Sequence, residues 1–93
     1  MTQTVERTSR GSGSGLGSAW KVIVLNDNHN TFEGVAAALS RVLPGVSYDQ
    51  GLRMADQIHS SGRAIVWSGH REAAELYWSE LKASALTMAP LEQ

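Results

Sequence analysis

Five consecutive polar residues, Asn26-Asp27-Asn28-His29-Asn30, form the most informative group of side chains that could bind a ligand. They follow directly on an apolar run and precede an amphipathic stretch, so they occupy a loop between two regular elements, where binding groups are commonly held. Asn and Asp also hydrogen-bond their own backbone in turns and cap helices. Ordinary turn chemistry is therefore the competing interpretation of this loop.

His59 is the second candidate, because it lies near the end of an apolar helical pattern. A lone histidine in such a place is commonly a satisfied core residue. The three histidines, His29, His59 and His70, lie in different expected elements, and no His-Glu-x-x-His or paired-carboxylate spacing supports zinc binding or acid-base catalysis. We therefore expect no metal, no cofactor and no enzymatic activity. A small hydrolase or metal enzyme built on His29, His59 and Asp27 is the least favoured interpretation.

The elements that must position these residues follow from local patterns. The run at 20–25, Trp-Lys-Val-Ile-Val-Leu, is apolar and β-branched and predicts a buried strand that ends at the polar loop. Apolar residues at spacings of three and four predict a helix over 32–43. We expect Asn30 to cap this helix in a capping box with Glu33, and Pro44-Gly45 to end it.

A second helix opens at the capping pattern Ser47-Tyr48-Asp49-Gln50 and ends at Gly62, just beyond His59. Its expected apolar side carries Tyr48, Leu52, Ala55, Ile58 and His59. Residues 63–67 then predict a second strand, since the run Arg-Ala-Ile-Val-Trp is apolar and leads into the turn at Ser68-Gly69.

A third helix follows this turn, with Ala73, Leu76, Tyr77 and Leu81 at helical spacing. Residues 86–89 predict a last short strand before Pro90. The order β-α-α-β-α-β predicts a single small α+β domain at 20–93, with three helices packed on a small three-stranded sheet.

Residues 1–19 differ from the rest in being rich in Thr, Ser and Gly, with Val5 and Leu16 as the only large apolar side chains after Met1. Such a composition cannot offset the entropy lost on ordering. We expect a disordered Gly/Ser-rich N-terminal extension at 1–19 that acts as a tether, with an inert leader as the alternative.

Charge and composition narrow the range of partners. The formal net charge is −1 and neither sign forms a long run, so nucleic acid and membrane surfaces are not expected as partners. The chain has no cysteine and no run of the ~20 apolar residues that a membrane span needs. We expect a cytoplasmic protein.

Two motifs stand out in the sequence: the run Lys21-Val22-Ile23-Val24-Leu25-Asn26-Asp27 and, about thirty residues later, Ile58-His59-x-x-Gly62-x-Ala64. Together they resemble the ClpS family of ATP-dependent Clp protease adaptors. The likeness extends over 20–92. The ending at 86–92 and the Pro44-Gly45 break resemble the cyanobacterial and plastid branch.

The resemblance implies an adaptor that binds N-degrons, which are proteins with Leu, Phe, Tyr or Trp as their first residue. By position, Asn26 and His59 would hydrogen-bond the α-ammonium group of the ligand, while Asp27 would help through its charge and a water molecule. Such a cation has three donors and needs fixed acceptors.

The resemblance also implies an apolar pocket for the first side chain. The positions that match the pocket of the family are Asn30, Phe32, Val35, Ala55, Ile58 and Thr87. Relatives commonly carry Met at 32 and 55 and Leu near 87, so the resemblance leaves the preferred first residue open.

The expected second partner is the N-terminal domain of a ClpA- or ClpC-type unfoldase, docked through the third helix. Glu72 matches an acid of the family there, and Tyr77 stands where a Lys is common. An alternative is a binding module that uses Trp67 and Tyr77 to regulate the unfoldase without capturing cargo.

Overall fold

The computed structural model describes residues 19–93. The predicted extension at 1–19 therefore lies, apart from its last residue, outside the described part of the chain. Five regular elements are formed in the order β1-α1-α2-β2-α3. Their bounds are Trp20–Leu25 for β1, Phe32–Val42 for α1, Tyr48–Ser61 for α2, Arg63–Gly69 for β2 and Arg71–Ala83 for α3.

Strands β1 and β2 pair antiparallel, from Trp20 opposite Gly69 to Leu25 opposite Arg63. A bulge between Val22 and Ile23 shifts the register. Along the described chain these two strands make up the whole sheet. The prediction of a small α+β domain with three helices is confirmed, and the three-stranded sheet is not.

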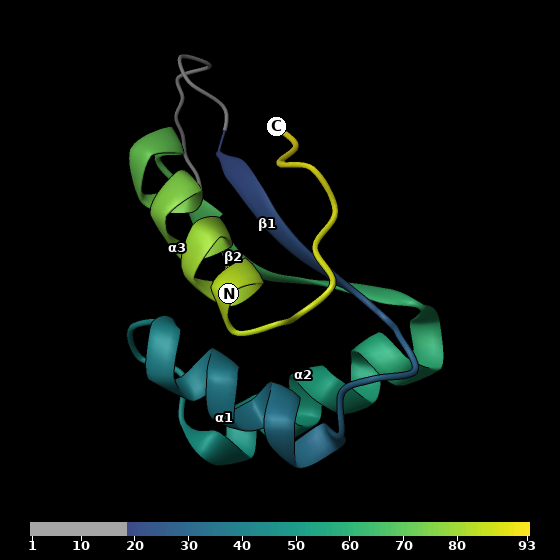
Figure 1. Ribbon diagram of the computed structural model, residues 1–93. Helices are drawn as coiled ribbons and strands as arrows, with labels where there is room; N and C mark the ends of the chain where they lie inside the picture. The colour runs from purple at the N-terminus through teal and green to yellow at the C-terminus, as the bar shows by residue number, and fades with distance from the viewer. Residues whose placement is uncertain (1–18) are drawn as a thin grey trace.

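The predicted strand at 86–89 is instead an extended segment that returns along the free edge of β1 (Figure 1). It contacts β1 through isolated bridges at Val24–Met88 and Lys21–Glu92. Pro90 lies between the two bridges and has no N–H to donate, so the ladder cannot run through it. The segment is nevertheless held firmly, because Leu25 N–H donates to Thr87 O at 2.8 Å and Ala89 N–H to Ile23 O at 3.1 Å.

Helices α1 and α2 pack against each other at one end of the molecule, and α1 also contacts α3 (Figure 1). Their backbones meet at Gly51, where a Cβ atom would lie 2.7 Å from the carbonyl oxygen of Ala36. The short connection between them makes the pair antiparallel. The start of α1, which follows the polar loop, therefore lies beside the end of α2, which carries His59.

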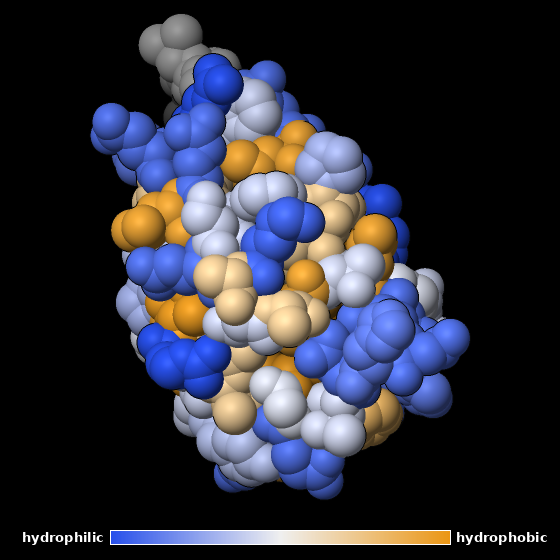
Figure 2. Space-filling view, in the orientation of Figure 1, coloured by the Kyte–Doolittle hydropathy of each residue, from blue (hydrophilic) through white to orange (hydrophobic). Residues whose placement is uncertain are grey.

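The hydrophobic core lies between the sheet and the helices. Its largest fully buried side chains are Ile23, Leu39, Leu81, Val22 and Val24. On the face shown in Figure 2, apolar side chains form small separate patches among polar ones. No helix within residues 19–93 is long and apolar enough to cross a lipid bilayer.

The cap of α2 is confirmed and the predicted cap of α1 is wrong. Ser47 Oγ accepts from Gln50 N–H at 3.1 Å, and Gln50 Oε1 accepts from Ser47 N–H at 3.0 Å. At α1 the cap is Thr31, whose Oγ1 accepts from Gly34 N–H at 2.9 Å. Asn30 cannot serve there, because its side chain is turned back to other partners.

Part of the predicted apolar side of α3 is also wrong. Leu76 is 53% exposed, whereas Ala74 and Leu81 are fully buried. The helix is thus rotated relative to the pattern that its larger side chains predict, so that the small Ala74 faces the core. Tyr77 is half-buried and packs edge-on against Trp67 of β2, with ring centroids 4.9 Å apart.

Candidate ligand-binding site

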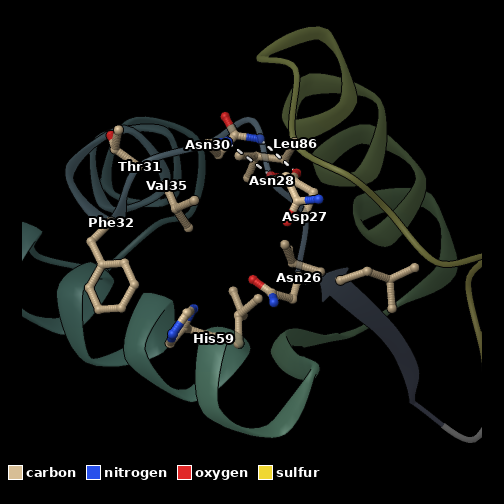
Figure 3. Close-up of a pocket in the computed structure, with 12 residues that line it drawn as sticks. Asn26, Asp27, Asn28, Asn30, Thr31, Phe32, Val35, His59 and Leu86 are labelled. Atoms are coloured by element: carbon tan, nitrogen blue, oxygen red, sulfur yellow. Dashed lines mark hydrogen bonds between the residues drawn. The ribbon is translucent and has the colours of Figure 1, made fainter.

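A cavity of about 220 Å³ opens where β1, the polar loop at 26–31, the start of α1 and the end of α2 converge. Figure 3 shows the side chains around it, with the polar side chains of the loop and of His59 and the apolar Phe32, Val35 and Leu86 surrounding one space. The apolar lining residues include Val24, Phe32, Val35, Ile58 and Leu86. The cavity therefore joins hydrogen-bonding groups and an apolar wall in one space.

The two stretches of sequence with candidate polar groups meet here, because Asn26, Asp27 and His59 all line this cavity. The backbone ties them together, since Asn26 N–H donates to Gly62 O at 2.9 Å directly after α2 ends. Gly62 makes that end possible with a left-handed φ of 88°, a conformation that favours glycine.

Four of the six predicted wall residues line the cavity, and two do not. Asn30, Phe32, Val35 and Ile58 line the cavity, as do Leu25, Asn28 and Thr31, which were not predicted as wall residues. Ala55 is not among the lining residues and is buried in the core at 3% exposure. Leu86 lines the cavity where Thr87 was expected. In an extended segment neighbouring side chains point to opposite sides. An assignment that is one position off therefore replaces a side chain that lines the cavity by one that does not.

Asp27 organises the polar loop through its carboxylate. Its Oδ1 accepts from the backbone N–H groups of His29 and Asn30, each at 2.9 Å. Its Oδ2 accepts from Asn30 Nδ2 at 2.8 Å and from the hydroxyl of Thr87 at 2.7 Å. Asn30 Nδ2 also donates to Ala85 O at 3.0 Å. The loop thus makes the hydrogen bonds of an ordinary turn, and Asp27 and Asn30, which take part in them, also line the cavity.

These donors hold the pKa of Asp27 well below its ordinary value. The largest cause is the Thr87 hydroxyl, followed by the backbone N–H of Asn30, while partial desolvation acts in the opposite direction. Each donor stabilises the charged form of the carboxylate. Asp27 is therefore an anion at neutral pH and places a negative charge at the cavity.

Asn26 and His59 have their polar side-chain atoms available to a ligand. Within residues 19–93 neither side chain hydrogen-bonds to another group, and Figure 3 shows the Asn26 amide turned toward the His59 ring. The His59 ring is held from the other side by Phe32, with centroids 5.3 Å apart in an edge-on arrangement. Phe32 is 38% exposed and forms the rim of the cavity.

The remaining candidate residues lie elsewhere. Glu72 and Tyr77 are on α3, which contributes no lining residue to this cavity. Tyr77 instead lines a second, open depression beside residues 40–47. In the described part of the chain, no three His, Asp or Glu side chains gather in a way that could hold a metal ion.

Comparison with known proteins places this geometry in a family. The family model for the ATP-dependent Clp protease adaptor protein ClpS matches residues 15–92. The ATP-dependent Clp protease adapter protein ClpS of Thermosynechococcus vestitus is 51% identical over 73 residues, which are 78% of either chain. That of Nostoc sp. is also 51% identical over 73 residues, covering 78% of this chain and 75% of the relative.

A solved structure agrees with the fold. Agrobacterium tumefaciens ClpS2 bound to L-phenylalaninamide superposes with a TM-score of 0.70 and 30% identity, covering 80% of this chain and 94% of that one. The resemblance seen in the two motifs is thereby confirmed, and both bacterial relatives are cyanobacteria, as expected for the branch. The chain belongs to the ClpS family of ATP-dependent Clp protease adaptor proteins.

Proposed function

We propose that this adaptor binds the free α-amino group and the bulky apolar first side chain of its substrates, and delivers them to a ClpA- or ClpC-type unfoldase. It does so in the cytoplasm and without chemistry of its own. The observation that carries the proposal is that acceptors without a side-chain partner among residues 19–93, a carboxylate and an apolar wall share one cavity.

The polar side of the cavity suits a cationic chain end. A free α-amino group has a reference pKa of about 8 and is mostly an ammonium with three donors at neutral pH. Asn26 and His59 supply acceptors, and the ionised Asp27 supplies a compensating charge. A charge-assisted hydrogen bond contributes roughly 1.5–3 kcal/mol.

The apolar side supplies the second half of the affinity. Burial of a Leu or Phe side chain contributes roughly 1.5–3 kcal/mol. Val35 and Ile58 form the inner wall, and Phe32 stands at the rim. The related Agrobacterium ClpS2 was solved with L-phenylalaninamide, a molecule that combines a free α-amino group with an aromatic side chain. Both halves of that ligand have a matching surface here.

Fluorescence anisotropy with labelled peptides that differ only at the first residue tests this proposal. A peptide beginning with Phe should bind at least tenfold more tightly than its acetylated form, because acetylation removes the charge and two donors and leaves acceptors unpaired. It should also bind more tightly than a peptide beginning with Gly. Titration across Leu, Phe, Tyr, Trp and Ile then ranks the side chains that the cavity accepts.

Single variants connect the result to the cavity. Asn26→Ala and His59→Ala should each weaken binding about fivefold or more. They should melt like the wild type, because both side chains are exposed. His70→Ala is the matched control, since His70 is exposed and its side chain makes no capping bond at α3. Equal affinity for free and acetylated peptides would reject the proposal.

We assign docking of the unfoldase to α3, with Glu72 and Tyr77 as contacts. The support is that Glu72 is exposed and that Tyr77, packed edge-on against Trp67, borders an open depression away from the cargo cavity. Glu72→Lys should reduce cargo delivery to the unfoldase and leave peptide binding unchanged. Unfoldase regulation without any peptide binding would favour the alternative of a purely regulatory module.

A further inference from the structure

The polar loop of the cargo site is anchored by a C-terminal segment whose own polar side chains do not line the cavity. Thr87 lies in the extended segment after α3, sixty residues from Asp27 along the chain, and donates its hydroxyl to Asp27 Oδ2 at 2.7 Å. Its backbone is fixed at the same point, since Thr87 O accepts from Leu25 N–H at 2.8 Å. The backbone hydrogen bond to β1 therefore holds the Thr87 hydroxyl in place next to the loop.

The acceptor capacity of Asp27 is filled by the protein itself. An ionised carboxylate offers about four lone-pair positions. Four donors already occupy them, namely the N–H groups of His29 and Asn30, the Asn30 amide and the Thr87 hydroxyl. No position remains for a direct bond to a ligand, whereas Asn26 next to it has no side-chain partner within residues 19–93.

The same contacts tie the loop to the end of α3. Asn30 Nδ2 bridges Asp27 Oδ2 and the carbonyl oxygen of Ala85. Ala85 has a left-handed φ of 72°, a conformation that costs a non-glycine residue energy and is kept only where surrounding contacts hold it. The loop and the segment at 85–87 thus form one cross-linked unit around the Asp27 carboxylate.

We propose that Thr87 is a positioning residue for the α-ammonium group of the cargo: by locking the Asp27 carboxylate it sets the loop so that Asn26 faces His59. Asp27 then acts on the cation by its charge and through the loop, without direct hydrogen bonding. This inference rests on the proposed function and adds residues 85–87 to the site.

The test compares Thr87→Val, which removes the hydroxyl at nearly constant shape, with Thr87→Ser, which keeps it. The two ligands are L-phenylalaninamide and 3-phenylpropanamide, which has the same ring and amide but no α-amino group. Affinities are measured by NMR titration, which also reports weak binding. Ser47→Ala is the stability control, because it removes a helix cap at the far end of α2 and should lower stability by a comparable amount.

Thr87→Val should weaken binding of L-phenylalaninamide about five- to tenfold and leave 3-phenylpropanamide within twofold of the wild type. Thr87→Ser should bind L-phenylalaninamide like the wild type. Ser47→Ala should leave the affinity for both ligands unchanged. The carboxyl resonance of Asp27 should titrate closer to the ordinary aspartate range in Thr87→Val, which shows directly that the lock is lost.

The outcomes separate the inference from the proposed function. Wild-type affinity of Thr87→Val for L-phenylalaninamide would overturn the positioning role, and so would an equal loss for both ligands, which indicates a purely structural residue. A wild-type protein that does not distinguish the two ligands would instead overturn the proposed function, and the positioning role with it.

Discussion

At the scale of single residues, Asp27 couples the site to folding through its ionisation. Its pKa is lowered in the folded protein, chiefly by the Thr87 hydroxyl. A carboxyl group with a lowered pKa adds stability that is fully present above its ordinary value of about 3.9 and disappears as the pH falls through its value in the folded state. The contribution of Asp27 should therefore be constant near neutral pH and decline in acid.

Asp27→Asn should lower the free energy of unfolding by about 1–2 kcal/mol at pH 7, because an amide cannot accept all four donors. The difference between wild type and variant should narrow below about pH 4. Urea unfolding of both proteins between pH 7 and 3 measures this difference. The contributions of the other carboxyl groups are the same in both proteins and cancel. A difference that stays constant over this range would contradict a role of the Asp27 charge.

Several residues that line the cavity could be predicted at this scale, but their arrangement could not. Side-chain type and position picked out Asn26, Asp27 and His59, and all three line the cavity. The sequence could not show that Thr31 rather than Asn30 would cap α1, because Ala85, one of the two partners of the Asn30 side chain, comes near it only after the chain has folded. For the same reason, nothing local linked Thr87 to Asp27.

At the scale of elements, the site depends on how closely α1 and α2 approach. Gly51 allows this contact, since a Cβ there would lie 2.7 Å from Ala36 O, a backbone atom that cannot easily move away. Alanine favours an isolated helix by about 1 kcal/mol over glycine. Overpacking costs about 1–3 kcal/mol and here has no flexible side chain to relieve it.

Gly51→Ala should therefore destabilise the domain by about 1–2 kcal/mol despite the better helix propensity of alanine. Chemical denaturation measures the change. Ser60→Ala is the control, because Ser60 is exposed in the same helix, and it should stay within about 0.5 kcal/mol of the wild type. A Gly51→Ala variant as stable as the wild type would contradict this prediction. It would show that α1 and α2 can move apart slightly without loss of stability.

Elements with complete local signals could be predicted well, and those that depend on distant contacts could not. Helix α2 has both its capping box and its terminal Gly62 written in the sequence. The segment at 86–92 has the composition of a strand, but Pro90 interrupts its pairing with β1, and it remains two isolated bridges. The rotation of α3 was hidden as well, because Ala74 carries little weight in an apolar pattern although it is fully buried.

At the scale of the whole molecule, the cavity is assembled from segments far apart in the sequence: the end of β1 with the loop, the start of α1, the end of α2, and Leu86. None of these segments forms the cavity by itself. Small domains of this size usually unfold in one cooperative step. A ligand that binds only the assembled cavity should therefore stabilise every part of the domain, including parts that it does not touch.

Tryptophan fluorescence can test this coupling, because Trp20, Trp67 and Trp78 do not line the cavity. Trp78 reports on the C-terminal segment in particular, since its Nε1 donates to Ala89 O at 2.7 Å. L-phenylalaninamide at one hundred times its dissociation constant should raise the free energy of unfolding by about 2.7 kcal/mol. The urea transition should shift equally by fluorescence and by circular dichroism, and 3-phenylpropanamide at the same concentration should shift both by less, because it binds more weakly. A fluorescence transition that stays in place while the ligand is bound would show that the cavity folds independently of the tryptophan side.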